Sequence, residues 1–388
     1  MRDPLSSVVK DIKPSGIRKF FDIVSEMKDA ISLGVGEPDF DTPWHIREEG
    51  IYSLERGQTF YTSNTGLKEL KKEIVKYLER KINVEYDYDG EIIVTVGGSE
   101  AIDIACRAML DPGDEVLVPQ PSYVSYVPCV ELTHAVPVVI NLKEENQFRL
   151  TKEELLEHIT DKTKLLVLPF PNNPTGAIME AKDLEDIAKI CVEKDIFVLS
   201  DEIYSELTYG TDHVSIASFP GMRERTVVIN GFSKGFAMTG WRLGYAAAPK
   251  LIMEQMLKIH QFAIMCAPTT SQYAAVDALQ HGEKDVQRMR ESYNQRRRFL
   301  MHSFKEMGIE CFEPFGAFYV FPNIKKFGLS SEEFATRLLQ EEKVAVVPGT
   351  AFGDCGEGFL RISYAYSLDN LKLALGKIKD FVGRLEQK

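Results

Sequence analysis

The sequence predicts an α/β protein whose large domain holds a mainly parallel sheet between helices, together with a smaller α+β domain. The first observation is length, because 388 residues suggest two or three domains at about 150 residues each. The second is an alternation of short apolar runs with helical stretches up to about residue 280. The third is a change of pattern after that point.

The apolar runs predict the strands of the sheet. They lie at residues 92–96, 115–119, 136–140, 164–170, 196–200 and 226–230. Amphipathic stretches such as AKDLEDIAKICVEK lie between them, and GGSEAIDIACRAML follows the first run and ends at the turn DPGD. Short and nearly continuous apolar strands that alternate with helices are typical of a parallel sheet covered on both faces.

The smaller domain follows from the C-terminal pattern. A polar helix, EKDVQRMRESYNQRRRFLMHSFKEMG, leads to short strand-like runs and two further helical stretches. We therefore expect a large domain at residues 45–280 and a small domain made of residues 1–44 and 281–388.

The amino-acid composition limits the kinds of binding partner that we expect. Hydrophobic residues make up 44% and charged residues 27%, as in ordinary globular enzymes, and the net charge of −12 disfavours nucleic acid or an anionic membrane as a partner. The six cysteines form no CxxC pair, which predicts neither a metal site nor a disulfide framework. Neither a signal peptide nor an apolar run of about 18 residues is evident, so we expect a cytoplasmic protein.

Polar residues follow five of the predicted strands at their carboxyl ends. Ligands of parallel sheets bind outside this edge, so we expect these residues to share one site. They are Gly98 and Ser99, the segment 119–123, Asn172 and Asn173, Asp201, and Ser233 and Lys234.

Lys234 lies among apolar side chains in NGFSKGFAMTGWRLGY, including Phe232, Phe236 and Trp241. Partial screening from water lowers the pKa of a lysine, and the neutral amine is a nucleophile. The other residues each have a simple structural explanation: Asp201 as a helix cap, PNNPTG as a loop, and GGSEA as a tight turn. Together they supply a phosphate cradle, a carboxylate, a phenol at Tyr204, an amide and a lysine, which is the set that pyridoxal phosphate requires.

Seven blocks in the chain resemble those of the fold-type I, class I pyridoxal-phosphate aminotransferases, in the branch of bacterial aspartate and aromatic aminotransferases. They occur in order from residue 34 to 363: GVGEPDF, YTSNTGL, GGSEA, PNNPTG, SDEIY, SKGFAMTGWRLGY and FLRIS. The resemblance implies an aspartate aminotransferase-like fold, a pyridoxal 5'-phosphate cofactor, and an amino acid and a 2-oxo acid as substrates.

The resemblance also implies roles. Lys234 would bond covalently to the cofactor and then move a proton at the substrate's Cα, while Asp201 would pair with the ring nitrogen. Tyr204 and Asn173 would bond the ring's 3-oxygen, and Tyr123 would stack on the ring. The residues expected to hold the phosphate are Gly98, Ser99, Ser233, Arg242 and Tyr61.

Tyr61 would reach the phosphate of the neighbouring subunit, so a homodimer with shared sites is expected. Substrate would be bound by Gly36, Asn173 and Arg361, with Arg361 gripping the α-carboxylate as a fork. One departure is visible: some relatives have a serine three residues before the lysine, where this chain has Gly231.

Two other enzyme classes are compatible with parts of the sequence. GFSKG also fits the GxSxG elbow of serine hydrolases, with Ser233 as nucleophile and His260, His281 or His302 as base. That elbow needs a helix after the serine, whereas FAMTGWRLGYAAA predicts a loop and a strand. A C–S lyase acting on sulfur amino acids would use the same cofactor residues. A partner-binding protein with a decayed site is disfavoured by the complete residue set.

The amino donor is the least determined feature. Aspartate-preferring members of this branch often have a lysine where this chain has Ser99, and without it a buried distal carboxylate would lack a partner. The sequence therefore favours an aromatic or broad neutral donor, with 2-oxoglutarate as acceptor. Aspartate or an acylated diamino acid are the alternatives. Ile17, Phe20 and Phe21 could wall the side-chain pocket, or lie on an amphipathic surface helix.

Overall fold

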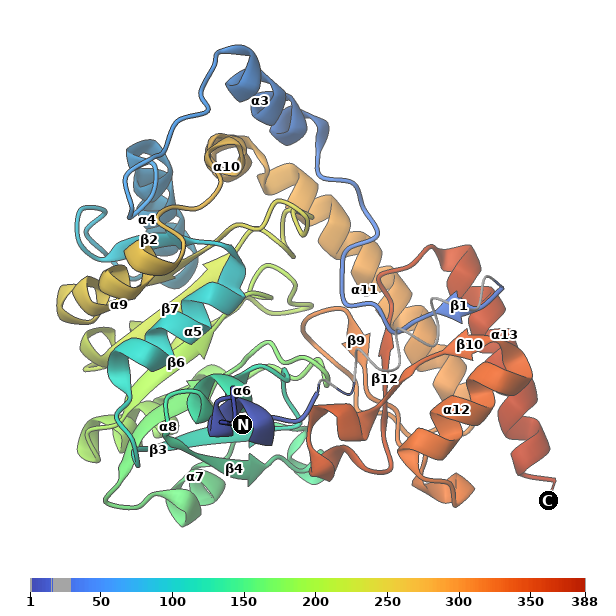
Figure 1. Cartoon of the computed structure of the whole chain (residues 1–388). Helices are drawn as coiled ribbons and strands as arrows, with labels where there is room; N and C mark the ends of the chain where they lie inside the picture. The colour runs from blue at the N-terminus through green and yellow to red at the C-terminus, as the bar shows by residue number, and fades with distance from the viewer. Residues whose placement is uncertain (1, 15, 17–28, 388) are drawn as a thin grey trace.

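The computed structural model describes residues 2–14, 16 and 29–387, and in this part of the chain the central element is a seven-stranded sheet (Figure 1). The strand order is β2-β8-β7-β6-β5-β3-β4. The strands are Ile92–Thr95 (β2), Glu115–Gln120 (β3), Val136–Asn141 (β4), Thr163–Leu168 (β5), Phe197–Asp201 (β6), Thr226–Gly231 (β7) and Gly244–Ala247 (β8). β8 pairs antiparallel with β2 and β7, and the other pairs are parallel. The predicted, mainly parallel sheet is confirmed.

Helices cover both faces of the sheet. They are Lys68–Ile82 (α4), Gly97–Met109 (α5), Tyr126–Glu131 (α6), Lys152–His158 (α7), Ala181–Glu193 (α8), Lys250–Ala263 (α9) and Thr269–His281 (α10). Trp44–Glu55 (α3) packs on α10 instead, farther from the sheet (Figure 1). Successive strand residues point to opposite faces. Accordingly Ile93 packs in a cluster with α5 and α9, whereas its neighbours Ile92 and Val94 pack in a cluster with α4 and α10. Burial on both sides explains why the strands are apolar throughout.

Local signals fix the ends of these helices. At the start of α7 the Thr151 side chain accepts from the backbone N–H of Glu154, whose carboxylate accepts from the N–H of Thr151 in return, and this is a capping box. α4 ends at Asn83, whose φ of 54° is the left-handed conformation that commonly terminates helices. The helices are therefore placed by their own sequence as well as by packing.

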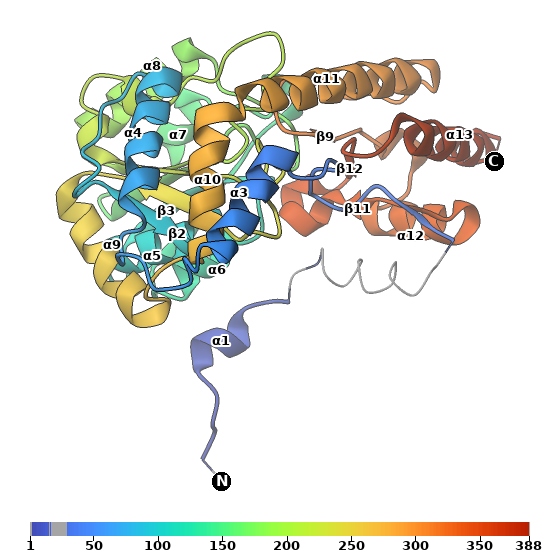
Figure 2. The same cartoon turned by 90° about the horizontal axis from the view of Figure 1, so that it is seen from above.

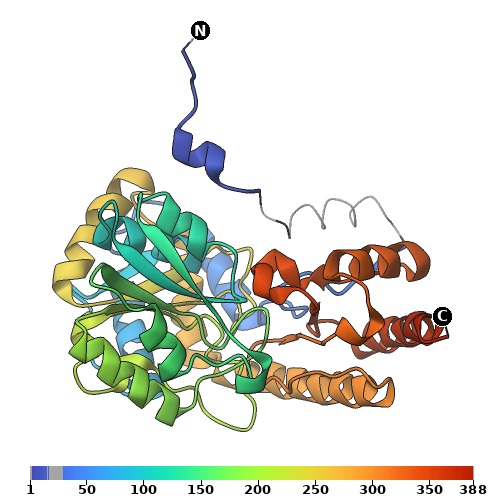
Figure 3. The ribbon, with the colours of Figure 1, turned by 90° about the horizontal axis from the view of Figure 1, so that it is seen from below.

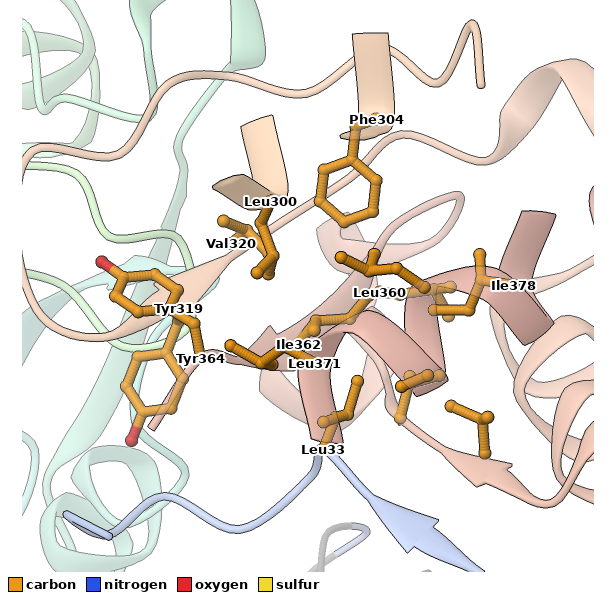
Figure 4. Close-up of a cluster of buried hydrophobic side chains, with 14 of the residues drawn as sticks. Leu33, Leu300, Phe304, Tyr319, Val320, Leu360, Ile362, Tyr364, Leu371 and Ile378 are labelled. Carbon is orange, nitrogen blue, oxygen red and sulfur yellow. The ribbon is translucent and has the colours of Figure 1, made fainter. Parts of the chain in front are cut away.

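A further hydrophobic cluster lies mainly in the C-terminal part (Figure 4). Its helices are Glu283–Glu306 (α11), Ser331–Glu342 (α12) and Leu368–Leu385 (α13), and its short strands are Ile31–Ser32 (β1), Tyr319–Val320 (β9), Val344–Ala345 (β10), Val347–Pro348 (β11) and Leu360–Ser363 (β12). β1 pairs with β10, and Leu33 packs into the same cluster. This pairing supports the proposal that the N-terminal 44 residues and residues 281–388 form one small domain.

The N-terminal helix Ser7–Asp11 (α1) has no buried residue and lies apart from the rest of the ribbon (Figures 2 and 3). Ile17, Phe20 and Phe21, expected as possible walls of a side-chain pocket, lie outside the described residues. Among the helices of the described residues, none combines the length and apolar character needed to cross a membrane.

Candidate active site

The predicted site residues, apart from Tyr61, lie together at one edge of the sheet. Because β8 alone opposes the other strands, the carboxyl ends of β2, β3, β5, β6 and β7 meet at this edge, where a cavity of about 530 Å³ opens toward the C-terminal part. All the predicted site residues except Tyr61 line it: Gly36, Gly98, Ser99, Tyr123, Asn173, Asp201, Tyr204, Ser233, Lys234, Arg242 and Arg361. Tyr61 lies outside the cavity and its side chain is 80% exposed.

Lys234 follows β7 and donates a 2.5 Å hydrogen bond from Nζ to the carbonyl oxygen of Gly36. Its ammonium lies 5.7 Å from the ring centres of Tyr204 and Phe318. Burial, and then the nearby positive charge of Arg361, lower the pKa of Lys234 to about 8. This direction agrees with the prediction from the sequence, and a pKa of about 8 leaves roughly a tenth of the amine neutral at pH 7.

Asp201 ends β6 and is 7% exposed. Burial raises the pKa of Asp201 to about 6, although hydrogen bonds from the Tyr126 hydroxyl (2.7 Å) and the Ile203 backbone N–H (3.2 Å) oppose the rise. Tyr126 is not among the residues predicted from the sequence. Its signal is the second tyrosine of QPSYVSY, and its ring meets that of Tyr123 edge-on with the ring centres 5.7 Å apart.

Tyr204 meets a second tyrosine that was also missed. The hydroxyl oxygens of Tyr204 and Tyr319 lie 2.8 Å apart, and Tyr319 belongs to β9 in the C-terminal cluster, where Figure 4 shows its ring at one end. Gly36 packs against the same phenol, because a Cβ on Gly36 would lie 2.5 Å from the Tyr319 hydroxyl oxygen. A side chain at position 36 would therefore clash with Tyr319 at the cavity wall, and the predicted role of Gly36 in substrate binding stays a prediction.

Arg361 is 2% exposed and is held by two acceptors. Nη1 donates to Asn173 Oδ1 over 2.9 Å, and Nη2 donates to the carbonyl oxygen of Gly34. The guanidinium carbon lies 4.6 Å from the ring centre of Tyr319 and 4.8 Å from that of Phe352. Nε is buried and has no partner within the described residues. A buried donor without an acceptor is costly, so this guanidinium suits an anionic ligand.

The turn before α5 forms a second place for an anion. Gly97 has a φ of 77°, and the N–H groups of Gly98 and Ser99 lie in the first turn of α5, where helical acceptors are lacking. A Cβ on Gly97 would lie 2.8 Å from Nη2 of Arg242, so the guanidinium packs directly on the turn. Nη1 of Arg242 donates to the carbonyl oxygen of Thr239 over 2.9 Å, which fixes the side chain.

Gly231 departs from the pattern of some relatives for a steric reason. It pairs with Gly244 of β8, and a Cβ on Gly231 would lie 2.9 Å from the Cα of Gly244. A serine side chain there would require the two strands to separate. The glycine at this position therefore goes with close packing of β7 and β8, and the loss of one phosphate contact relative to those relatives stays a prediction.

The hydrolase alternative finds no support in this geometry. None of His260, His281 and His302 lines the cavity, and between residues 232 and 243 the chain forms turns that lead into β8. The helix that a nucleophile elbow requires after Ser233 is therefore missing from this described segment.

Comparison with known proteins decides the family, because residues 28–378 match the family model described as aminotransferase class I and II. The chain belongs to this family. Aspartate aminotransferase of Pyrococcus abyssi is 48% identical over 371 residues, covering 95% of each protein. Aromatic-amino-acid aminotransferase 2 of Thermococcus litoralis is 44% identical over 378 residues, covering 97% of each. The crystal structure of aromatic aminotransferase from Pyrococcus horikoshii OT3 superposes with a TM-score of 0.91 at 45% identity, covering 95% of this chain and 99% of that one.

The protein is therefore a pyridoxal-phosphate-dependent aminotransferase with the aspartate aminotransferase-like fold. The residues of its cavity fit the cofactor of the family. Lys234 offers an amine with a pKa of about 8, Asp201 a buried carboxylate, and the turn at Gly97 with Arg242 a place for a phosphate group. The unpartnered Nε of Arg361 leaves a donor for a substrate anion.

Proposed function

We propose that this aminotransferase moves the amino group of an aromatic or other neutral L-amino acid to a 2-oxo acid such as 2-oxoglutarate. The observation that carries the proposal is which positively charged side chains line the cavity. Among the described residues of the cavity wall, the lysines and arginines are Lys234, Arg242 and Arg361. With these three assigned to the cofactor, its phosphate and the α-carboxylate, a second carboxylate on the donor would be buried without a partner, which is unfavourable by several kcal/mol.

When bound, pyridoxal phosphate supplies an aldehyde that condenses with amines and a ring that accepts the electron pair left at the substrate's Cα. Lys234 then serves as the base that takes and returns the proton at Cα, a task that suits a pKa of about 8. Asp201, largely ionised above its pKa of about 6, holds the proton on the ring nitrogen. Tyr204 and Asn173 would hold the ring through its 3-oxygen, and Tyr123 would lie against its face.

The phosphate is assigned to Gly98, Ser99, Ser233 and Arg242. Arg361 binds the α-carboxylate, because its planar guanidinium is already oriented by Asn173 Oδ1 and the Gly34 carbonyl. Lys234 lines the same cavity and donates to the Gly36 carbonyl, so we expect the substrate amine to face Lys234 when Arg361 holds the α-carboxylate.

We also propose a homodimer with shared sites. Large apolar side chains are exposed on α3, on the following loop and at the end of α9, which is unfavourable in a free monomer. They include Trp44, Tyr52, Leu54, Phe60, Tyr61 and Phe262. Tyr61 lies in this set and outside its own cavity, which supports the assignment of its hydroxyl to the phosphate of the partner subunit.

The donor is tested by offering single amino acids to the loaded enzyme and following the cofactor's absorbance, with 2-oxoglutarate consumption as the second half-reaction. Phenylalanine and tyrosine should react fastest. The relatives are named for aspartate and for aromatic amino acids at similar identity, so fast reaction with aspartate alone is the result that contradicts the proposal. Fast reaction only with an acylated diamino acid also contradicts it.

A matched variant sharpens this test. Ser99→Lys places a cation beside the phosphate turn and should raise kcat/KM for aspartate relative to phenylalanine, by about tenfold for 1.4 kcal/mol of pairing energy. Product analysis separates the lyase alternative, because a C–S lyase converts its substrate and water into a thiol, ammonia and a 2-oxo acid over many turnovers without an acceptor 2-oxo acid. Transamination stops after one half-reaction unless the acceptor is present.

A further inference from the structure

A buried pair of side chains lies directly behind the phosphate-binding turn. Glu100, in the first turn of α5, faces His260 of α9, and His260 Nδ1 lies 2.5 Å from Glu100 Oε1. An ionised carboxylate only accepts, so Nδ1 donates this bond. His260 is fully buried, and its Nε2 has no partner within the described residues. Neither residue lines the cavity.

The second oxygen of the same carboxylate holds the turn itself. Glu100 Oε2 accepts from the backbone N–H of Val96 over 2.5 Å, so the side chain reaches back across Gly97, Gly98 and Ser99. The Thr95 hydroxyl donates to the carbonyl oxygen of Gly97 over 2.9 Å. Together these two hydrogen bonds hold the backbone at residues 95–97, where the turn begins. They fix the direction of the N–H groups that would meet a phosphate.

The hydrogen bond from His260 matters because the Glu100 carboxyl group lies next to the turn that would bind a phosphate. A free carboxylate in this turn could rotate and accept the N–H groups of Gly98 or Ser99, in competition with the phosphate. The hydrogen bond from His260 holds Oε1 toward α9, the helix that packs against α5. The pair thereby keeps the carboxylate turned away from the cavity, and the N–H groups remain available.

We propose that Glu100 and His260 are positioning residues for the phosphate-binding turn Gly97–Gly98–Ser99, through which they increase affinity for the phosphate group of the cofactor. The identity of that ligand rests on the proposed function. A merely structural pair between α5 and α9 would instead contribute to the stability of the fold and treat phosphorylated and unphosphorylated ligands alike.

The test measures the Kd of the cofactor-free full chain for pyridoxal phosphate and for pyridoxal, which lacks the phosphate. Glu100→Ala and His260→Ala should weaken pyridoxal phosphate by about tenfold or more, because a buried donor or carboxylate loses its partner, and should change pyridoxal by less than about twofold. Glu100→Gln should restore most of the affinity, since the amide oxygen accepts from Val96. His281→Ala is the control, because it removes a similar contact, His281 to Asp277, away from the cavity.

Circular dichroism and thermal unfolding establish that each variant is folded. If Glu100→Ala does not fold, Glu100→Asp replaces it, because its carboxylate is one methylene too short for Val96. A folded variant that binds pyridoxal phosphate within twofold of the wild type overturns the proposal, and so does an equal loss for both ligands. A wild-type protein that shows no preference for the phosphorylated ligand contradicts the cofactor assignment, and the positioning proposal fails with it.

Discussion

The Nζ of Lys234 donates a 2.5 Å hydrogen bond to the carbonyl oxygen of Gly36. The contact joins the loop after β7 to the segment that leads from β1 to α3, across 198 positions of the sequence. It holds the amine at the wall that Tyr319 also shapes, since Gly36 packs on the Tyr319 hydroxyl.

Lys234→Ala should abolish transamination while the protein stays folded and still binds pyridoxal phosphate noncovalently. The substitution removes the base and the covalent attachment but leaves the turn at Gly97 and Arg242 in place. Borohydride reduction followed by mass spectrometry measures covalent cofactor, and a coupled assay measures turnover. Lys189→Ala, at an exposed lysine paired with Glu185, should retain both signals. Near wild-type turnover in Lys234→Ala would refute the assignment.

The pKa of Lys234 predicts selective chemistry in the cofactor-free protein. With a pKa of about 8, roughly a tenth of the amine is neutral at pH 7, and the fraction rises through pH 8 to 9. Trapping of pyridoxal on Lys234 by borohydride should increase over the same range with a midpoint near pH 8. Lys189, whose pKa is raised by its hydrogen bond to Glu185, is the internal comparison. Equal labelling of the two lysines across this range would argue against desolvation at Lys234.

The sequence predicted those parts of the site that each follow their own strand. Asp201 ends β6, Asn173 follows β5 and Lys234 follows β7, so one rule about strand ends places all three. Tyr319 follows no such rule, because it comes from β9 and its partner Tyr204 lies 115 positions away. Its contact depends on how the C-terminal cluster packs against the sheet. That packing is a tertiary property with no local signature.

His260 illustrates a different limit. The sequence has seven histidines, and His260 lies on an ordinary amphipathic helix where its only predicted role is that of a hydrolase base. Its partner Glu100 is 160 positions away and was noted only as part of the backbone turn. The antiparallel position of β8 was also not predicted in detail, since GYAA alone does not specify which strands it pairs with. Pairings of this range follow from the complete fold.

Tyr126→Phe should shift the acidic limb of the pH–rate profile toward higher pH. The Tyr126 hydroxyl donates to Asp201 and lowers the pKa of that carboxyl, which burial has raised to about 6. Without the donor the pKa of Asp201 rises further, so the carboxylate becomes protonated, and activity falls, at a higher pH than in the wild type. The measurement is kcat/KM from pH 5 to 8, with Tyr88→Phe as control, because Tyr88 lies outside the cavity and its ring contacts Lys72. An unchanged acidic limb would show that the hydroxyl has no influence on the carboxyl.

Asp201→Ala should keep pyridoxal phosphate and lose kcat by about 100- to 1000-fold or more, because an unprotonated ring is a poor electron acceptor. Equilibrium binding of the cofactor and single-turnover kinetics separate the two effects. Asp103→Ala, at an exposed carboxylate paired with Arg107, should behave as the wild type. A loss of only a few fold in Asp201→Ala would assign Asp201 to a capping role in the turn toward Ile203.

Mixed dimers test the assignment of Tyr61. Its side chain is 80% exposed and lies outside its own cavity, so in a homodimer with shared sites its hydroxyl serves the partner subunit. Tyr61→Ala and Lys234→Ala homodimers should each be impaired, the first by weakened cofactor binding and the second in catalysis. In a hybrid of the two, one of the two sites carries both changes and the other carries neither, so mixing should restore up to about half of the wild-type activity per hybrid dimer.

Subunit exchange is verified by native mass spectrometry with one variant isotopically labelled. A mixture of Lys234→Ala with Asp201→Ala is the control, because both residues line one chain's own cavity and every site in that hybrid remains defective. If exchange is complete and activity does not exceed that of the separate Tyr61→Ala sample, Tyr61 does not act across the subunit interface.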